Sequence, residues 1–292
     1  MGQVEIREGI WFPETYLFGR MNMAIKMLAL DLDDTLLDST QRISPQCLQV
    51  IRRARETGVL VTVATGRMFR SAAPYARELE LDIPMIAYQG ALVKTLLSDE
   101  VFYYKTIHRD LAGEILELLQ LRGVVHHMYC NDYLYMMEVP ELARQYLEIA
   151  RIEPIITHDF EGVLRQHEAT EIMVVAAQEE LLLETEAEIR SRFGSQLHIT
   201  SYRNRFLEIM HRDATKGKAL EVLSRHYGIE RREVMAIGDS LNDLSMVEWA
   251  GIGVAMGNAE PEVKEAADFV TLSNDEEGVA EAIRRFVLQD LS

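Results

Sequence analysis

The chain has 292 residues, of which 48% are hydrophobic and 26% charged, a composition typical of a folded globular protein rather than a disordered one. Its formal net charge of -17 repels nucleic acid and anionic membrane surfaces, so we expect neither as a partner. An anionic small substrate remains compatible with this charge if a metal ion or a lysine supplies local positive charge. At roughly 150 residues per domain, the length suggests two domains or one domain with a large insertion.

Two cysteines, Cys47 and Cys130, form no CxxC pair, which gives no support for a disulfide framework or a zinc cluster and favours a reducing, cytoplasmic setting. The first 23 residues contain no apolar run suited to a signal peptide, and no later stretch reaches the ~18 apolar residues of a membrane span. We predict that residues 1–23 are a leader outside the fold: a flexible arm, the product of an upstream translation start, or residues that do not belong to the native protein. Nothing in the sequence indicates an oligomeric state.

The first regular elements predict a βαβ unit. The run IKMLALD over residues 25–31 is almost continuously apolar and ends in an acid, as expected of a parallel strand buried on both faces. Ser44 and Pro45 then supply an N-cap and a first-turn proline for a helix. Further apolar runs over residues 59–64 and 84–88 predict two more strands, and strands that alternate with helices indicate a doubly wound parallel sheet.

After this unit the pattern changes to short strands and hairpins, which predict an α+β block. We expect its helices near residues 111–121, 141–151 and 179–192, and its strands in the runs LVKT, VFYYK, HHMYC, LYMME, TEIMVVA, LHIT and FLEIM. From Thr215 the alternation of helices and strands returns and continues to a closing helix. The predicted fold is therefore α/β: a Rossmann-like core of residues 24–91 and 206–292, interrupted by an inserted α+β domain of residues 92–205.

Open parallel sheets bind ligands beyond the carboxyl ends of their strands, so chemistry is expected in the loops there. The first such loop, DLDDTLLD, presents Asp31, Asp33 and Asp34 at the end of the first strand. The second, ATGR, offers the Thr65 hydroxyl and backbone amides at the start of a helix, which suit phosphate.

Two later loops add positive charge and further oxygen ligands. TKGKAL begins a helix with Lys216, whose ammonium can neutralise a phosphate oxygen. GDSLND follows the strand EVMAI and presents Asp239, Asn242 and Asp243. Hard oxygen ligands from two separate loops are what Mg²⁺ prefers, and Asp31 and Asp239 would supply them.

Each loop alone also has an ordinary structural explanation, because acids after a strand often cap helices and the other motifs resemble common turns. A calcium-binding loop beginning at Asp31 is excluded, since Leu36 stands where glycine is required and Arg42 where glutamate is required. The functional interpretation is strengthened because all four loops flank core strands of one sheet. The separation of Asp31 and Thr65 matches one βαβ unit, whereas the much longer stretch that follows leaves room for the inserted domain.

Together the motifs DLDDT, TGR, TKGK and GDSLND resemble those of the haloacid dehalogenase superfamily, and more closely its Cof-type phosphatases, which carry an α+β cap domain between the third core strand and the lysine motif. The resemblance covers the chain from about Ala24 to the C-terminus. It implies a Mg²⁺-dependent phosphatase that hydrolyses small phosphorylated metabolites, such as a sugar phosphate, a nucleotide or a phosphorylated cofactor, through an aspartyl-phosphate intermediate.

The same resemblance assigns roles to residues. Asp31 would be the nucleophile and a Mg²⁺ ligand, and Asp33 the acid/base that also offers its carbonyl to the metal. Asp239 would bind Mg²⁺, and Asp243 would support the residues that contact metal and phosphate without contacting either itself. The substrate phosphate would be held by Leu32 through its amide and by Thr65, Gly66, Lys216 and Asn242.

Gln89 departs from the family pattern, in which Asn often precedes this glycine, and this leaves the local contacts with the cap and substrate open. A hexose phosphomutase with a similar cap is an alternative function. A receiver module that is phosphorylated to change a binding surface is another, although it has no use for a large insertion. The substrate itself is not readable from the sequence. Five cap residues could reach the site, namely His126, His127, Tyr129, Tyr133 and Tyr135, although aromatic and histidine residues in a strand more often belong to the core or the surface.

Overall fold

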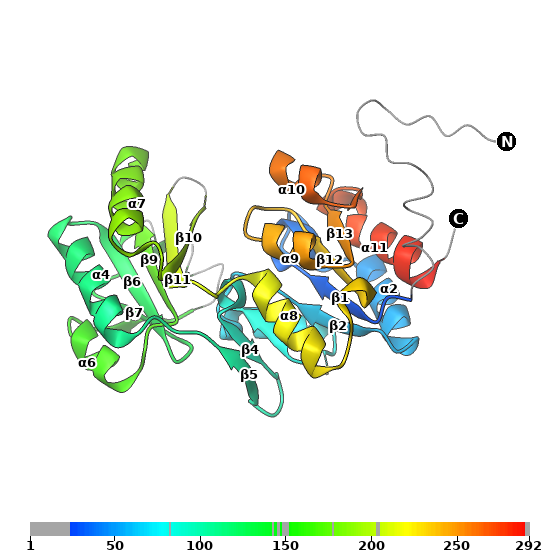
Figure 1. The fold of residues 1–292 in the computed structure, drawn as a ribbon, viewed down its shortest axis with the longest axis horizontal. Coiled ribbons are helices and arrows are strands. Elements are labelled where there is room, and N and C mark those ends of the chain that lie inside the picture. The colour runs from blue at the N-terminus through cyan, green and yellow to red at the C-terminus, as the bar shows by residue number, and fades with distance from the viewer. Residues whose placement is uncertain are drawn as a thin grey trace.

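The computed structural model describes residues 24–289 except 82, 142, 145–146, 148–151, 177 and 203–204. The predicted leader, residues 1–23, lies outside the described residues, and so does most of the helix predicted at 141–151. Two bodies of secondary structure lie side by side, one built on a parallel sheet and one on a largely antiparallel sheet (Figure 1). The fold is therefore the predicted α/β core with an inserted α+β cap.

The core sheet has the strand order β14-β13-β12-β1-β2, and every pairing in it is parallel. Its strands are β1 (Met27–Leu30), β2 (Leu60–Val63), β12 (Val234–Gly238), β13 (Ile252–Ala255) and β14 (Phe269–Val270). All residues of β1 and β12 are buried, as their continuous apolar runs predict for strands covered on both faces.

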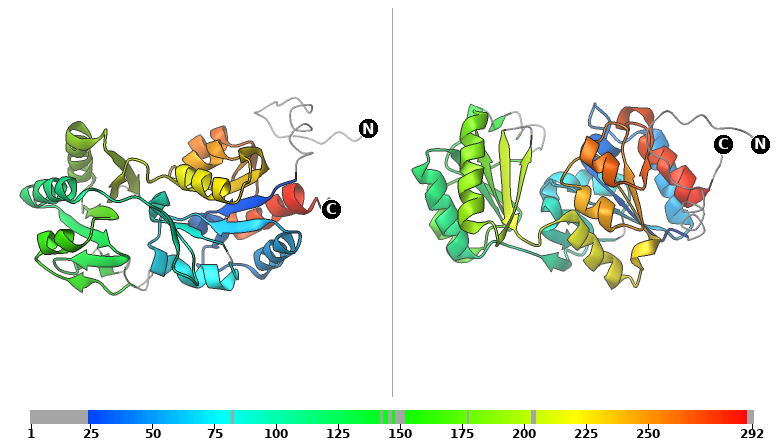
Figure 2. Two further views of the ribbon diagram at one scale, coloured as in Figure 1. Left: turned by 60° about the horizontal axis from the view of Figure 1, so that its bottom comes forward. Right: turned by 45° about the horizontal axis from the view of Figure 1, so that its top comes forward.

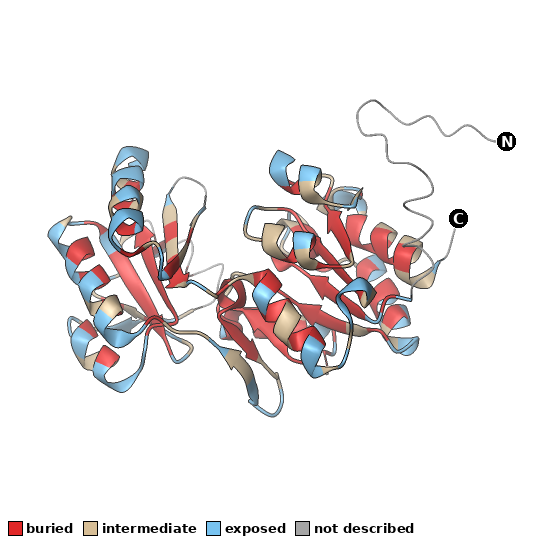
Figure 3. Ribbon diagram, viewed as in Figure 1, coloured by how far each residue is buried: buried red, intermediate tan, exposed pale blue. Residues whose placement is uncertain are grey.

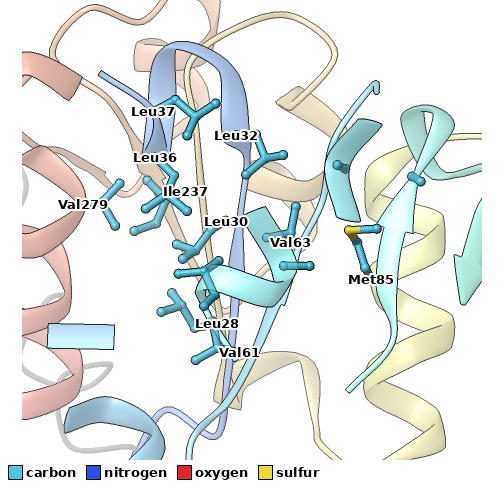
Figure 4. Close-up of a cluster of buried hydrophobic side chains, with 14 of the residues drawn as sticks. Leu28, Leu30, Leu32, Leu36, Leu37, Val61, Val63, Met85, Ile237 and Val279 are labelled. Atoms are coloured by element: carbon cyan, nitrogen blue, oxygen red, sulfur yellow. The ribbon is translucent and has the colours of Figure 1, made fainter. Parts of the chain in front are cut away.

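Helices cover both faces of this sheet, which makes it doubly wound. Leu28 and Leu30 of β1 point into an apolar cluster shared with Val279 (Figure 4), whereas Met27 and Ala29 contribute to a second cluster. The first cluster includes residues of α2 (Pro45–Glu56), α3 (Phe69–Glu78) and α11 (Gly278–Ile283). The second includes residues of α8 (Lys216–His226) and α9 (Leu244–Trp249).

Strand β3 (Met85–Ala87) extends the core on the far side of β2. A single parallel bridge between Ala64 and Ile86 joins it to that strand. On its other edge it pairs with the antiparallel hairpin β4 (Leu92–Lys94) and β5 (Val101–Tyr104), so this hairpin, predicted as part of the insertion, continues a core strand. The strand is shorter than the predicted 84–88 because the chain turns at residues 88–90.

The inserted sheet has the order β10-β11-β9-β6-β7-β8. Its strands are β6 (Val125–Cys130), β7 (Tyr133–Met136), β8 (Ile155–Ile156), β9 (Glu171–Val175), β10 (Leu197–Tyr202) and β11 (Phe206–His211). Its described helices are α4 (Arg109–Leu121), α6 (Phe160–Gln166) and α7 (Glu179–Phe193), which lie on the side away from the core (Figures 1 and 2). The opposite face is turned toward the core, because Tyr129, Met173 and Met210 join the apolar cluster of the core.

The seven strand runs predicted for the insertion are all found, and α6 and β8 are present in addition. Helices α4 and α7 correspond to the predicted 111–121 and 179–192. Strand β11, however, pairs with β10 and β9, so the predicted start of the second core segment at residue 206 falls one strand too early. The chain returns to the core between β11 and α8.

The remaining elements are short. They are α10 (Pro261–Ala266), the 3-10 turns Tyr88–Gly90, Arg231–Glu233 and Asn274–Glu276, and the π-helical turns Leu32–Leu36 and Arg284–Leu288. Burial follows the layers, with strands buried and the outer faces of helices exposed (Figure 3). Among the described residues, no helix combines the length and the apolar character needed to cross a membrane.

Candidate active site

The first site loop is a tight turn directly after β1. Asp31 continues the sheet pairing through its amide, which donates to the Ile237 carbonyl at 3.1 Å. The chain then reverses through residues 32–36, helped by the left-handed backbone of Asp34 (φ 58°), a conformation that Asp tolerates better than most residues. Leu32 is buried within the turn and Asp33 is partly exposed, so the turn separates a buried carboxylate at Asp31 from a more accessible one at Asp33.

Lys216 lies fully buried between two carboxylates. Its Nζ donates to Oδ1 of Asp31 at 2.6 Å and to Oδ1 of Asp243 at 2.5 Å. Burial alone would lower the pKa of Lys216, but Asp243 and Asp31 together raise it above its ordinary value, so the side chain stays charged. Burial, followed by the charge of Asp243, raises the pKa of Asp31 well above its ordinary value, while Lys216 opposes this.

The loop after β12 is organised by Asp243. Its Oδ2 accepts hydrogen bonds from the amides of Asp239 (2.9 Å) and Ser240 (3.1 Å), which closes the loop on itself. Gly238 is required below it, because a Cβ there would lie 2.4 Å from the Cβ of Asp243. Thr35 donates to Asp239 at 3.0 Å and so ties the first loop to this one. Burial and the nearby Asp243 raise the pKa of Asp239 to about 7.

The carboxylates of Asp31, Asp239 and Asp243 form a candidate metal site. Each offers an oxygen, and these three oxygens lie within 4.8 Å of one another. Both oxygens of Asp243 already accept hydrogen bonds, whereas Asp31 and Asp239 each keep one oxygen without a partner within the described part of the chain. Several buried carboxylates facing a single ammonium leave excess negative charge, and hard oxygen donors suit a divalent cation. The residues present therefore fit a metal ion.

Three of the residues expected to hold phosphate, Thr65, Gly66 and Asn242, lie around Gln89. The backbone amide of Gln89 donates to the Thr65 carbonyl at 3.1 Å, and its side-chain Oε1 accepts from Nδ2 of Asn242 at 3.0 Å. A Cβ at Gly66 would lie 2.3 Å from Gln89 Nε2, so only glycine allows this approach. The structure thus brings Thr65, Gly66 and Asn242 to the same edge of the sheet as Asp31 and Lys216, as the motif spacing predicts.

Sequence reasoning missed a partner of Asp33. Arg67 donates from Nε to Oδ2 of Asp33 at 2.7 Å and from Nη2 to Oδ1 at 2.5 Å. It also donates to Gln41 at 2.6 Å and lies over the Tyr75 ring at 5.0 Å. Burial would lower the pKa of Arg67, but its bonds to Asp33 raise it above its ordinary value. The available signal was the arginine of the TGR motif itself.

The five cap residues named as able to reach the site divide between the two faces of the inserted sheet. Tyr129 is turned toward the core, where its ring meets the Tyr88 ring edge-on at 5.7 Å, and His127 packs edge-on against it at 5.6 Å. Tyr133 lies under the Arg70 guanidinium at 3.9 Å. His126 and Tyr135 pack into the cluster beneath the cap helices, because neighbouring residues of a strand point to opposite faces, so these two are core residues of the cap and do not reach the site.

Comparison with known proteins agrees with this geometry. The sequence profile of the haloacid dehalogenase-like hydrolases matches residues 28–283. The putative phosphatase YxeH of Bacillus subtilis is 34% identical over 271 residues, which cover 90% of this chain and 98% of the relative. The 5-amino-6-(5-phospho-D-ribitylamino)uracil phosphatase YcsE of the same organism is 31% identical over 92% of this chain and 98% of its own length.

Among solved structures, a haloacid dehalogenase-like hydrolase from Bacteroides thetaiotaomicron superposes with a TM-score of 0.82 at 31% identity, covering 89% of this chain and 99% of the other. The profile match and these similarities extend over both the core and the cap. The chain belongs to the haloacid dehalogenase-like hydrolase family, and within it to the Cof-type phosphatases.

Proposed function

We propose that this protein is a Mg²⁺-dependent phosphatase that hydrolyses small phosphorylated metabolites through an aspartyl-phosphate intermediate, an acyl phosphate on Asp31. The observation that carries the proposal is the contact of Asp31 with the buried ammonium of Lys216 at 2.6 Å, beside the carboxylate of Asp239. A carboxylate is a competent phosphoryl acceptor when positive charge faces the transferring oxygens. A metal held by Asp31, Asp239 and the Asp33 carbonyl would offset the charge that Lys216 alone leaves uncompensated.

In the first step, an oxygen of Asp31 forms a bond to phosphorus as the bond from phosphorus to the leaving oxygen breaks. Asp33 gives its proton to that oxygen, which leaves as an alcohol. In the second step, Asp33 takes a proton from water as the water oxygen attacks phosphorus, and the bond to Asp31 breaks to release phosphate. An alcohol side chain at position 33 could do neither task.

The remaining groups position the phosphate during both steps. Their donors are the Leu32 amide, the Thr65 hydroxyl, the amide of Gly66, the Lys216 ammonium and the Asn242 carboxamide. Asp243 supports them indirectly, because it fixes the loop of Asp239 and shares Lys216 with Asp31. Donors held in place before the reaction stabilise the transferring group without reorganisation at the moment of transfer.

The proposed substrate is a small metabolite rather than a macromolecule. The cap sheet turns Tyr129, Met173 and Met210 toward the core, and such a cover suits a compact leaving group. The name of the relative YcsE describes a phosphorylated ribitylaminouracil as its substrate, which supports a phosphorylated metabolite of similar size for this chain. In this proposal the core performs the transfer and the inserted domain selects the substrate.

Phosphate release from an aryl phosphate and from a panel of phosphorylated sugars, nucleotides and cofactors tests the proposal. We expect release of one phosphate per alcohol formed, lost in Asp31→Asn and retained in Asp110→Asn, a matched change on an exposed helix start. Transfer of phosphate between hydroxyls of a hexose phosphate without release would indicate a phosphomutase instead. Phosphate retained on the chain without turnover would indicate a receiver module.

A further inference from the structure

Gln89 occupies a buried, strained position between the core loops and the cap. Its backbone is left-handed (φ 55°), as is that of Tyr88 before it (φ 51°), and non-glycine residues hold such conformations only where the surroundings enforce them. The side chain is 5% exposed. Hydrogen bonds from the amides of Tyr88 to Arg67 (3.0 Å) and of Gln89 to Thr65 (3.1 Å) fix this turn against the TGR loop.

The Gln89 carboxamide uses both of its ends. Nε2 donates to Oε2 of Glu208 at 2.9 Å, and Oε1 accepts from Nδ2 of Asn242 at 3.0 Å. Oε2 of Glu208 accepts from Gln89 Nε2 and also from the Thr200 hydroxyl, so this contact fixes which way the carboxamide of Gln89 faces. The Gln89 oxygen must then face Asn242.

The contact at Glu208 belongs to the cap sheet. Glu208 lies on β11, opposite Thr200 on β10, and the Thr200 hydroxyl donates to the same Oε2 at 2.9 Å. Glu208 is therefore held by its own sheet while it contacts a core residue. The hydrogen bonds run without interruption from Thr200 through Glu208 and Gln89 to Asn242.

Asn242 ends this series at the proposed phosphate site. Its Oδ1 accepts from Ser240 Oγ at 2.7 Å, and its amino group carries two hydrogens, one of which is taken by Gln89. With one hydrogen held by Gln89 and the carbonyl held by Ser240, the orientation of Asn242 is determined and the second hydrogen is left for a ligand.

We propose that Gln89 is a positioning residue that fixes the phosphate-holding amide of Asn242 according to whether Glu208 of the cap is docked against it. The inference rests on the proposed role of Asn242 in holding phosphate. Asn242 is then oriented to bind phosphate only when the cap strand β11 contacts the core through Glu208. The length of the glutamine side chain lets it span from Asn242 to Glu208.

An exchange of polarity tests this series of hydrogen bonds. Gln89→Glu places a second carboxylate oxygen against Glu208 and should lower kcat/KM for an aryl phosphate by at least about tenfold, with weaker inhibition by inorganic phosphate. Glu208→Gln still accepts from Gln89 and should stay within about threefold of wild type. When the two changes are combined, the new carboxamide at position 208 can donate to the new carboxylate at position 89, which still accepts from Asn242. Both bonds then return, and most of the loss should be recovered.

A second neutral variant and a matched control complete the test. Gln89→Met removes both bonds without adding charge and should lower kcat/KM with no recovery when Glu208→Gln is added, so the test holds even if Gln89→Glu alone does not fold. Gln120→Glu, the same exchange at an exposed site on α4, should leave kcat/KM and the affinity for inorganic phosphate unchanged. The expected result is that the exchanged double variant, Gln89→Glu with Glu208→Gln, exceeds Gln89→Met by about tenfold in kcat/KM and in phosphate affinity.

If Gln89→Met lowers only the unfolding midpoint and leaves kcat/KM and phosphate affinity unchanged, the positioning role is overturned. An exchanged double variant no better than Gln89→Glu and Gln89→Met would overturn it as well. Failure of the proposed function is recognised separately, because wild type would then release no phosphate or Asp31→Asn would remain active.

Discussion

Arg67 holds Asp33 through two parallel hydrogen bonds, from Nε to Oδ2 at 2.7 Å and from Nη2 to Oδ1 at 2.5 Å. Both carboxylate oxygens of Asp33 are thus engaged, and the guanidinium sets their direction. If Asp33 is the acid/base, its orientation depends on Arg67.

Arg67→Lys tests this dependence because lysine keeps the charge but cannot form the two-pronged contact. Only steps that need a proton from or to Asp33 should suffer. We expect turnover of an alkyl phosphate to fall by about five- to tenfold, a loss of about one hydrogen bond, with a smaller effect on the first release of aryl alcohol from an aryl phosphate. Arg52→Lys, an exposed control on α2, should leave both rates unchanged. Equal losses for both substrates would argue against a link between Arg67 and Asp33.

Lys216→Met should destabilise the fold as well as abolish activity. It leaves the buried carboxylates of Asp31 and Asp243 without their shared counter-charge, and loss of one partner of a buried ion pair typically costs about 3–5 kcal/mol. Denaturant unfolding in the presence of a chelator measures this cost. Adding Asp243→Asn to the variant should restore part of the stability but none of the activity. A free energy of unfolding within about 0.5 kcal/mol of wild type would contradict the inferred role of this ammonium.

Metal removal should abolish activity and Mg²⁺ should restore it, because the carboxylates around Lys216 leave negative charge that opposes phosphate. Asp239→Asn should raise the metal concentration needed for half-maximal activity by at least about tenfold. Even the loss of a residue that only hydrogen-bonds to a metal ligand typically lowers metal affinity by that factor. Asp110→Asn serves as the exposed control. Full turnover in excess chelator would contradict the metal requirement.

The stability of the protein should respond to pH through two buried cap groups with opposite signs. Burial lowers the pKa of His127 from 6.5 to about 3, so below pH 6.5 the unfolded chain takes up a proton that the folded chain does not. Stability is then lost as the pH falls, by about 1.4 kcal/mol per pH unit. Compared with His127→Leu, wild type should lose about 2 kcal/mol more between pH 7 and pH 5.

Glu171 should act in the other direction. Burial, with a smaller contribution from Glu208, raises its pKa well above 4.5, so its folded form keeps a proton that the unfolded chain releases. This stability is present at low pH and is lost as the pH rises through the raised value. As the pH rises toward neutral, the free energy of unfolding of Glu171→Gln should therefore fall less than that of wild type. Parallel pH dependence of wild type and both variants in denaturant unfolding would refute the assignment of these groups.

The apolar runs predicted the core strands well because a strand buried on both faces leaves a continuous signal. The meeting of Asp31, Lys216 and Asp239 was predictable for a related reason, since the carboxyl ends of parallel strands share one edge. The boundary predicted at residue 206 was wrong because it cut off the run FLEIM, which the sequence pattern itself placed among the strands of the insertion. This run, β11, pairs with β10 and β9.

The sequence did not show which side chains of distant segments pair with one another. Gln89 and Glu208 are 119 residues apart, and their contact depends on how the cap lies on the core rather than on any local pattern. The same holds for Arg67 and Asp33, which are 34 residues apart on neighbouring loops. Motif spacing predicts which loops meet, but it does not predict which side chains pair within them.

The most direct test of the central claim is the covalent state of Asp33→Asn after mixing with an aryl phosphate. An aryl leaving group departs with little protonation, so Asp31 should still be phosphorylated, while breakdown of the aspartyl-phosphate lacks its base and should slow by about 10²- to 10⁴-fold. We predict a stoichiometric burst of aryl alcohol and a phosphorylated peptide that contains Asp31, with neither in Asp31→Asn. Turnover of Asp33→Asn at the wild-type rate, or phosphate on a peptide that lacks Asp31, would contradict the account.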